Sequence, residues 1–107
     1  MKEIKAIIQP FLVDKVLEAL HGIPELPGVT SSEVQGYGRA AGAGSAALFG
    51  EKKIKLELVV PDPLVEKVIQ IIRGHAYTGN PGDGKIFIST VDEVVKIRTG
   101  ERGDSAI

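Results

Sequence analysis

The stretch TGNPGDGKIF, residues 78–87, contains the residue types and the spacing of a phosphate-binding loop. Four residues separate Gly79 from Gly84, and Lys85 follows directly, as in a P-loop. A P-loop then needs a Ser or Thr hydroxyl to bind magnesium, whereas the next residue here is Ile86. It also needs a strand before the glycines and a helix after them. A helical pattern precedes this stretch and a β-branched strand pattern follows it, so the P-loop interpretation fails.

Two interpretations of this segment remain. Taken alone, NPGDG favours a plain helix-to-strand connection, because Asn, Pro, Gly and Asp are the usual turn residues. The alternative is an anion-binding nest, in which closely spaced glycines leave backbone N–H groups unshielded. Lys85 would add a positive charge to such a nest.

Two further segments combine glycine with cationic side chains. Lys96 and Arg98 in KIRTGER stand two residues apart, so in an extended tail both would project to the same side. Alternatively, these charges would prevent an edge strand from pairing with another sheet, a role that requires no ligand. Arg39 ends a third segment, GYGR. Three such sites in one small domain are consistent with a polyphosphate ligand.

The composition limits the class of protein. A chain of 107 residues, 43% of them apolar, is long enough for one folded domain with a modest core. The net charge of −1 provides no global basic field for nucleic acid, and the absence of cysteine excludes disulfide and thiolate chemistry. The N-terminus lacks the unbroken apolar core of a signal peptide, and no apolar run matches a bilayer. We therefore expect a cytoplasmic protein.

The apolar periodicity predicts alternating strands and helices. Gly22 is a natural end for the first helix, and Pro63 suits the first turn of the second. Strands are predicted over residues 3–9, 29–38, 52–60 and 84–91, helices over residues 10–21 and 61–75, and a short extended tail over residues 92–101.

A short internal repeat organises these elements. LVDKV at residues 12–16 and LVEKV at residues 64–68 each follow a strand and a proline. The chain is therefore predicted to be an α+β protein with the βαββαβ order of a ferredoxin-like fold, in which two helices cover one face of an antiparallel four-stranded sheet. The other face would carry Ile7, Val59 and Phe87. This face is too apolar to stay fully exposed to solvent, so we expect oligomerisation through it.

Five stretches together resemble the nitrogen-regulatory P-II signalling proteins, over nearly the whole chain. They are KAIIQPF, EVQGYGR, ELVVPD, TGNPGDGKIF and KIRTGERGDSAI, of which the last two are the most specific. The resemblance implies a homotrimer of ferredoxin-like subunits that binds an adenine nucleotide (ADP, AMP or ATP) between neighbouring subunits. It assigns residues 1–107 to one domain, with a flexible signalling loop at 39–53, a phosphate loop at 78–85 and a C-terminal segment at 96–107.

The resemblance also assigns roles to individual residues. In the family the phosphates lie against a glycine-lysine loop and three cations, and the adenine lies against the sheet. Carried over to this sequence, the phosphate residues are Gly82, Asp83, Gly84, Lys85, Arg39, Lys96 and Arg98, and the adenine residues are Ile7, Thr30, Glu57 and Val59. Lys96 stands where arginine is commoner, which keeps the charge but loses the bidentate fork.

Three departures from the family pattern affect the expected effectors. Ala40 replaces a glutamine and has no oxygen to offer magnesium, the loop at 39–53 contains no tyrosine, and Gln9 replaces a lysine. They argue against uridylylation and against 2-oxoglutarate binding through bridging magnesium. They suit a branch associated with carboxysomes and bicarbonate transport, in which a small anion such as bicarbonate would bind near Arg39 and Lys53.

The loop at 39–53 is the expected contact with a protein partner. Leu48 and Phe49 would form an apolar anchor for that partner, or they would fold back onto the sheet. The leading hypothesis is thus a sensor without catalytic residues or a metal site, which signals to a membrane transporter or a metabolic enzyme of carbon or nitrogen metabolism. The alternatives are a nitrogen-status sensor that binds ATP and 2-oxoglutarate, and a slow nucleotide phosphohydrolase, for which no evident base or metal ligand set is present.

Overall fold

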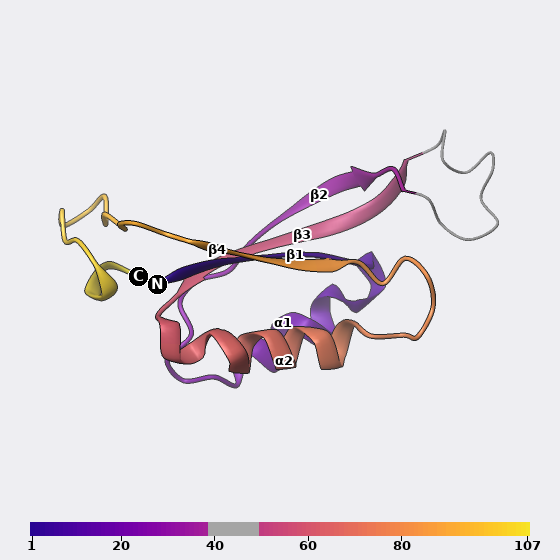
Figure 1. The fold of residues 1–107 in the computed structure, drawn as a ribbon, viewed down its shortest axis with the longest axis horizontal. Helices are drawn as coiled ribbons and strands as arrows, with labels where there is room; N and C mark the ends of the chain where they lie inside the picture. The colour runs from indigo at the N-terminus through magenta and orange to yellow at the C-terminus, as the bar shows by residue number, and fades with distance from the viewer. Residues whose placement is uncertain (39–49) are drawn as a thin grey trace.

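A computed structural model describes residues 1–38 and 50–107 of the chain, and within these residues it contains one sheet and two α-helices. Neighbouring strands are antiparallel in the order β2-β3-β1-β4, and both helices cover the same face of the sheet (Figure 1). The predicted ferredoxin-like α+β architecture is therefore confirmed. In chain order the elements are β1 (Lys2–Ile8), α1 (Val13–His21), β2 (Thr30–Gly36), β3 (Glu51–Val60), α2 (Val65–Ala76) and β4 (Lys85–Thr90).

The core lies between the sheet and the two helices. Alternate residues of β1, namely Ile4, Ala6 and Ile8, are buried against the helices, as the alternation in the sequence predicted. Each large aliphatic side chain buried in this way stabilises the fold by about 1.5–3 kcal/mol. The other buried members of the same cluster come from both helices, from β3 and from the connection after α1: Val16, Leu20, Ile23, Leu56, Leu58, Val60, Val68, Ile72 and Ala76.

Both helices start in the same way. A single 3-10 turn, Pro10–Leu12 before α1 and Asp62–Leu64 before α2, carries a proline near its first position. Proline suits this place because its missing N–H would have no helical partner and its φ is already helical. The end of α1 before Gly22 agrees with the prediction.

Two segments differ from the expectation. The tail after β4 does not stay extended to residue 101 but turns back on itself: Val95 bridges to Arg102, and the Lys96 N–H donates to the Glu101 carbonyl at 2.9 Å. Gly100 makes this reversal possible, because its φ of 74° lies in the left-handed region that glycine tolerates. The second difference is that β3 already begins at Glu51, so residues 51–53 are strand and not part of a flexible loop.

No helix in the two described ranges has both the length and the apolar character needed to cross a membrane.

The close approach of β4 to β1 makes Gly84 a sensitive position. A Cβ at Gly84 would lie 1.7 Å from the Ile7 carbonyl oxygen, and its φ is 102°. We expect Gly84→Ala to lower the free energy of unfolding by at least about 1–2 kcal/mol, the cost of left-handed backbone alone. Urea unfolding at one fixed protein concentration measures this change.

Gly74→Ala is the matched control within α2, where an added Cβ meets nothing within 4 Å. Alanine is the better helix former, so this substitution should raise the free energy of unfolding by about 0.8–1 kcal/mol. Equal effects of the two substitutions would contradict the assigned geometry of the β1–β4 contact.

Candidate functional site

The segment of residues 78–85, here called the glycine loop, connects α2 to β4. Its three glycines all have positive φ, with values of 87° at Gly79, 95° at Gly82 and 102° at Gly84. The segment is thus a helix-to-strand connection, as its sequence alone favoured. Its backbone conformation also depends on glycine at all three positions, since other residues rarely adopt these angles. The two interpretations of this loop are therefore compatible.

The Asp83 carboxylate closes the glycine loop from within. It accepts hydrogen bonds from the Thr78 N–H at 2.8 Å, from the Gly79 N–H at 3.0 Å and from the Thr78 hydroxyl. The hydroxyl and then the N–H of Thr78 hold the pKa of Asp83 below its ordinary value. The side chain of this predicted phosphate residue therefore shapes the loop, which leaves its backbone N–H as the group for a ligand.

The Gly82 carbonyl anchors the loop to the sheet. It accepts a hydrogen bond from Gln9 Nε2 at 2.8 Å and another from Lys53 Nζ at 2.6 Å. The Lys53 side chain is only 9% exposed, and its ammonium also lies 3.6 Å from a Glu51 carboxylate oxygen. The cation expected to bind a small anion is thus already engaged with two groups of its own chain.

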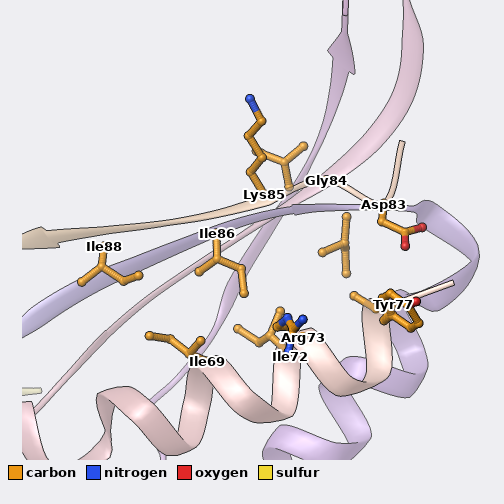
Figure 2. Close-up of a pocket in the computed structure, with 12 residues that line it drawn as sticks. Ile69, Ile72, Arg73, Tyr77, Asp83, Gly84, Lys85, Ile86 and Ile88 are labelled. Atoms are coloured by element: carbon orange, nitrogen blue, oxygen red, sulfur yellow. The ribbon is translucent and has the colours of Figure 1, made fainter. Parts of the chain in front are cut away.

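Lys85 begins β4 on the face of the sheet away from the helices, here called the outer face. It lies opposite Ile7 in the β1–β4 register, so two of the predicted nucleotide residues are direct neighbours. Figure 2 shows Lys85 pointing away from α2, while Ile86 on the same strand points toward it. The Lys85 ammonium therefore lies on the side of the sheet opposite the core.

The backbone of the glycine loop offers donors beside Lys85. Within the described ranges, no protein group accepts a hydrogen bond from the N–H groups of Gly82, Asp83 or Gly84. Successive free N–H groups next to a cation are typical of an anion-binding nest. The chemistry of this donor set fits the phosphates of a nucleotide.

The C-terminal cations lie far from the glycine loop. In the β1–β4 register Lys85 pairs with Ile7 at one end, whereas Thr90 pairs with Lys2 at the other, and the chain continues outward from there. Figure 1 shows the C-terminal segment and the glycine loop at opposite ends of the molecule. Within one copy of the chain, Lys96 and Arg98 therefore cannot meet Lys85.

The residues predicted for the adenine share the outer face. A cavity of about 380 Å³ is lined by Thr30, Glu57 and Val59 and is bordered by the last residues of the chain, Ala106 and Ile107. Such a volume lies within the usual range for small-molecule pockets. The fourth predicted adenine residue, Ile7, is not in this cavity but one step further along the same face, toward the glycine loop.

A second cavity, of about 390 Å³, opens between α2 and β4 (Figure 2). Its walls are mainly isoleucines from α2, β4 and β1, and its polar lining residues are Arg73, Tyr77, Asp83 and Lys85. The sequence indicated the buried stripe of α2, but it gave no sign that the edge of this stripe would stay open beside β4.

Four residues discussed in the sequence analysis lie outside the described residues: Arg39, Ala40, Leu48 and Phe49. Among residues 1–38 and 50–107, no three His, Cys, Asp or Glu side chains are placed to hold a metal ion.

Sequence reasoning missed two residues of the glycine loop's support. Thr78 appeared only as the first residue of TGNPGDGKIF, with no role assigned to its hydroxyl, which in the structure donates to the Asp83 carboxylate five residues later. Gln9 was considered only as the replacement of a lysine, and its contact with Gly82 spans 73 residues of sequence. No local pattern could have shown that contact.

Comparison with known proteins decides the family. The family described as nitrogen regulatory protein P-II matches residues 1–101. The chain belongs to the P-II family. Curated P-II proteins are similar over the full length of both chains: the nitrogen regulatory protein P-II of Azospirillum brasilense is 47% identical, that of Rhodospirillum rubrum 48%, and nitrogen regulatory protein P-II 1 of Escherichia coli 44%. These alignments run over 113 positions, six more than the 107 residues of this P-II chain.

The Asp83 closure makes the glycine loop of this P-II protein sensitive to acid. Folding lowers the pKa of Asp83. The contribution of its carboxylate to stability is therefore fully present above the ordinary pKa of 3.8 and is lost as the pH falls through the pKa in the folded state. In an NMR titration from pH 6 downward, we expect the amide signals of Thr78 and Gly79 to move only below about pH 4.

Asp83→Asn should abolish this titration and speed hydrogen exchange of both amides at pH 7. Asp92→Asn, which removes an exposed carboxylate outside the glycine loop, serves as the control. An unchanged titration in Asp83→Asn would show that another group controls the loop.

Proposed function

We propose that this P-II protein is a regulatory protein of nitrogen metabolism that senses adenine nucleotides between the subunits of a homotrimer. ADP, AMP and ATP would compete for the site, and the segment of residues 39–53 would pass the ligand state to a membrane transporter or a metabolic enzyme. The role in nitrogen regulation rests on the names of its full-length relatives. The proposal that the ligand is a nucleotide rests on the hydrogen-bond donors of the glycine loop.

One observation carries the location of the site. The glycine loop with Lys85 and the C-terminal cations Lys96 and Arg98 occupy opposite ends of the protomer. A polyphosphate that uses both clusters must therefore lie between two copies of the chain. A contact that joins one end of a subunit to the opposite end of the next closes into a ring when the rotation allows it. A cyclic trimer meets this requirement.

The outer face supplies the remaining contacts in this proposal. Ile7 and Val59 offer half-buried apolar surface for the adenine ring, and Thr30 and Glu57 offer polar groups beside it. Glu57 already lies 3.4 Å from the Lys55 ammonium, which limits how far its carboxylate can turn. The binding energy would come from the charged hydrogen bonds of the phosphates, because these are the strong ones.

The second effector is proposed to be a small anion such as bicarbonate, near Arg39 and Lys53. Lys53 supports this site only conditionally, because an anion there must compete with Gly82 and Glu51 for the ammonium. The alternative effector is 2-oxoglutarate, for which the same cation would serve. The two hypotheses differ in their need for magnesium.

Mixed trimers test the location of the site. Lys85→Met and Arg98→Met should each weaken ADP binding about 10-fold to 100-fold, the usual effect of losing a hydrogen bond to a charged group. If the residues act in trans, each trimer that mixes the two variants contains one unmutated site, and calorimetry should detect ADP binding of wild-type affinity there.

Lys67→Met, which removes an exposed lysine from α2, is the control for net charge. Failure of mixing to restore any tight site would contradict the location between subunits. Wild-type affinity in both single variants would contradict nucleotide binding by these cations.

Calorimetric titration identifies the effectors. We expect each of the three nucleotides to bind without magnesium, and bicarbonate to change the affinity for at least one of them. Binding of 2-oxoglutarate that depends on magnesium and ATP would instead support the nitrogen-status sensor. Phosphate release that Lys85→Met abolishes would support the phosphohydrolase.

A further inference from the structure

We propose that Gln9 and Lys53 are positioning residues for phosphate binding. They hold the Gly82 carbonyl toward the sheet and thereby turn the Asp83 N–H toward the ligand. This inference rests on the proposed nucleotide site, and it gives Lys53 a role that requires no direct contact with an anion.

The two donors come from different strands and converge on one oxygen. Gln9 follows the end of β1, and Lys53 lies near the start of β3. Their side-chain nitrogens are 2.8 Å and 2.6 Å from the Gly82 oxygen. Since a carbonyl oxygen has two lone pairs, both donors can be accepted at once, and the peptide plane loses its freedom to rotate.

The geometry of the peptide bond links this anchor to the ligand. All peptide bonds in the described residues are trans, and in a trans peptide the carbonyl and the following N–H point in opposite directions. The Gly82 carbonyl is directed at the sheet, so the Asp83 N–H is directed away from it. No protein group in the described ranges accepts a hydrogen bond from this N–H.

The Asp83 side chain fixes the same peptide from its other end. Its carboxylate is bound to the N–H groups of Thr78 and Gly79, so the residue cannot rotate freely about its backbone. A donor held in place before the ligand arrives costs little ordering entropy at the moment of binding. The glycine loop is therefore preorganised, with anchors on both sides of the peptide that joins Gly82 to Asp83.

The burial of Lys53 supports this role. A buried ammonium is costly unless it is paired, and here the Gly82 carbonyl and the Glu51 carboxylate supply its partners. Gln9 adds a donor without adding a charge. A lysine at this position would bring a second ammonium to the same oxygen, and two like charges so close repel each other. Glutamine at position 9 thus donates to the Gly82 carbonyl without bringing a second charge beside Lys53.

The test compares ADP with adenosine, which has no phosphate. Gln9→Leu should weaken ADP binding about five-fold, the usual effect of losing one neutral hydrogen bond, and should leave adenosine binding unchanged. Calorimetry measures ADP and an NMR shift titration measures adenosine. Gln70→Leu is the matched control, because Gln70 is exposed on α2 and outside the glycine loop.

Gln9→Glu is the second variant. A carboxylate would face the Gly82 carbonyl as one acceptor against another and would draw the Lys53 ammonium toward itself. We expect it to weaken ADP binding more than Gln9→Leu does, with adenosine again unaffected. Thermal unfolding of each variant shows whether the fold is intact.

The outcomes separate this inference from the proposed function. ADP binding of wild-type strength in both Gln9 variants overturns the positioning role and leaves the nucleotide site standing. Equal losses for ADP and adenosine also overturn it, since they show a merely structural role. Absence of ADP binding by the unmodified protein overturns the proposed function itself.

Discussion

The burial of one face of β1 is the interaction on which the rest of this P-II structure depends. Ile4, Ala6 and Ile8 are almost completely buried under the two helices, and β1 pairs with β3 on one side and with β4 on the other. A shift of this strand by one residue would turn every core side chain outward. The register of β1 therefore determines where Ile7 meets Lys85, and where Gln9 lies just after the end of the strand.

The glycine loop shows how a flexible sequence acquires one conformation. Its own residues supply positive φ angles and the Asp83 closure, while the sheet supplies the donors of Gln9 and Lys53. Gly84 passes directly over the Ile7 carbonyl, so the loop also follows the strand beneath it. The loop is therefore ordered both by its own residues and by its contacts with the sheet. That coupling explains how a segment rich in glycine can present backbone donors in fixed directions.

The sequence predicted the fold well because the relevant signals are local. Alternation in β1 and β3, the helical stripes and the prolines before both helices each lie within a few residues, and all are confirmed. The predicted extended tail was wrong at its end, because the chain reverses at Gly100 and Val95 bridges to Arg102. Gly100 and Gly103 both have positive φ, which allows the chain to reverse there.

The sequence by itself determined the family, the order of the elements, and the glycines and cations suited to an anion, because each of these is written in residue types at short spacing. Only the tertiary structure decided which of them are neighbours. It brought Lys85 beside Ile7, engaged Lys53 with the Gly82 carbonyl, and separated Lys85 from Lys96 and Arg98 by the length of β4. The physical reason is that these relations depend on strand register and on contacts between residues far apart in sequence, which no short pattern encodes.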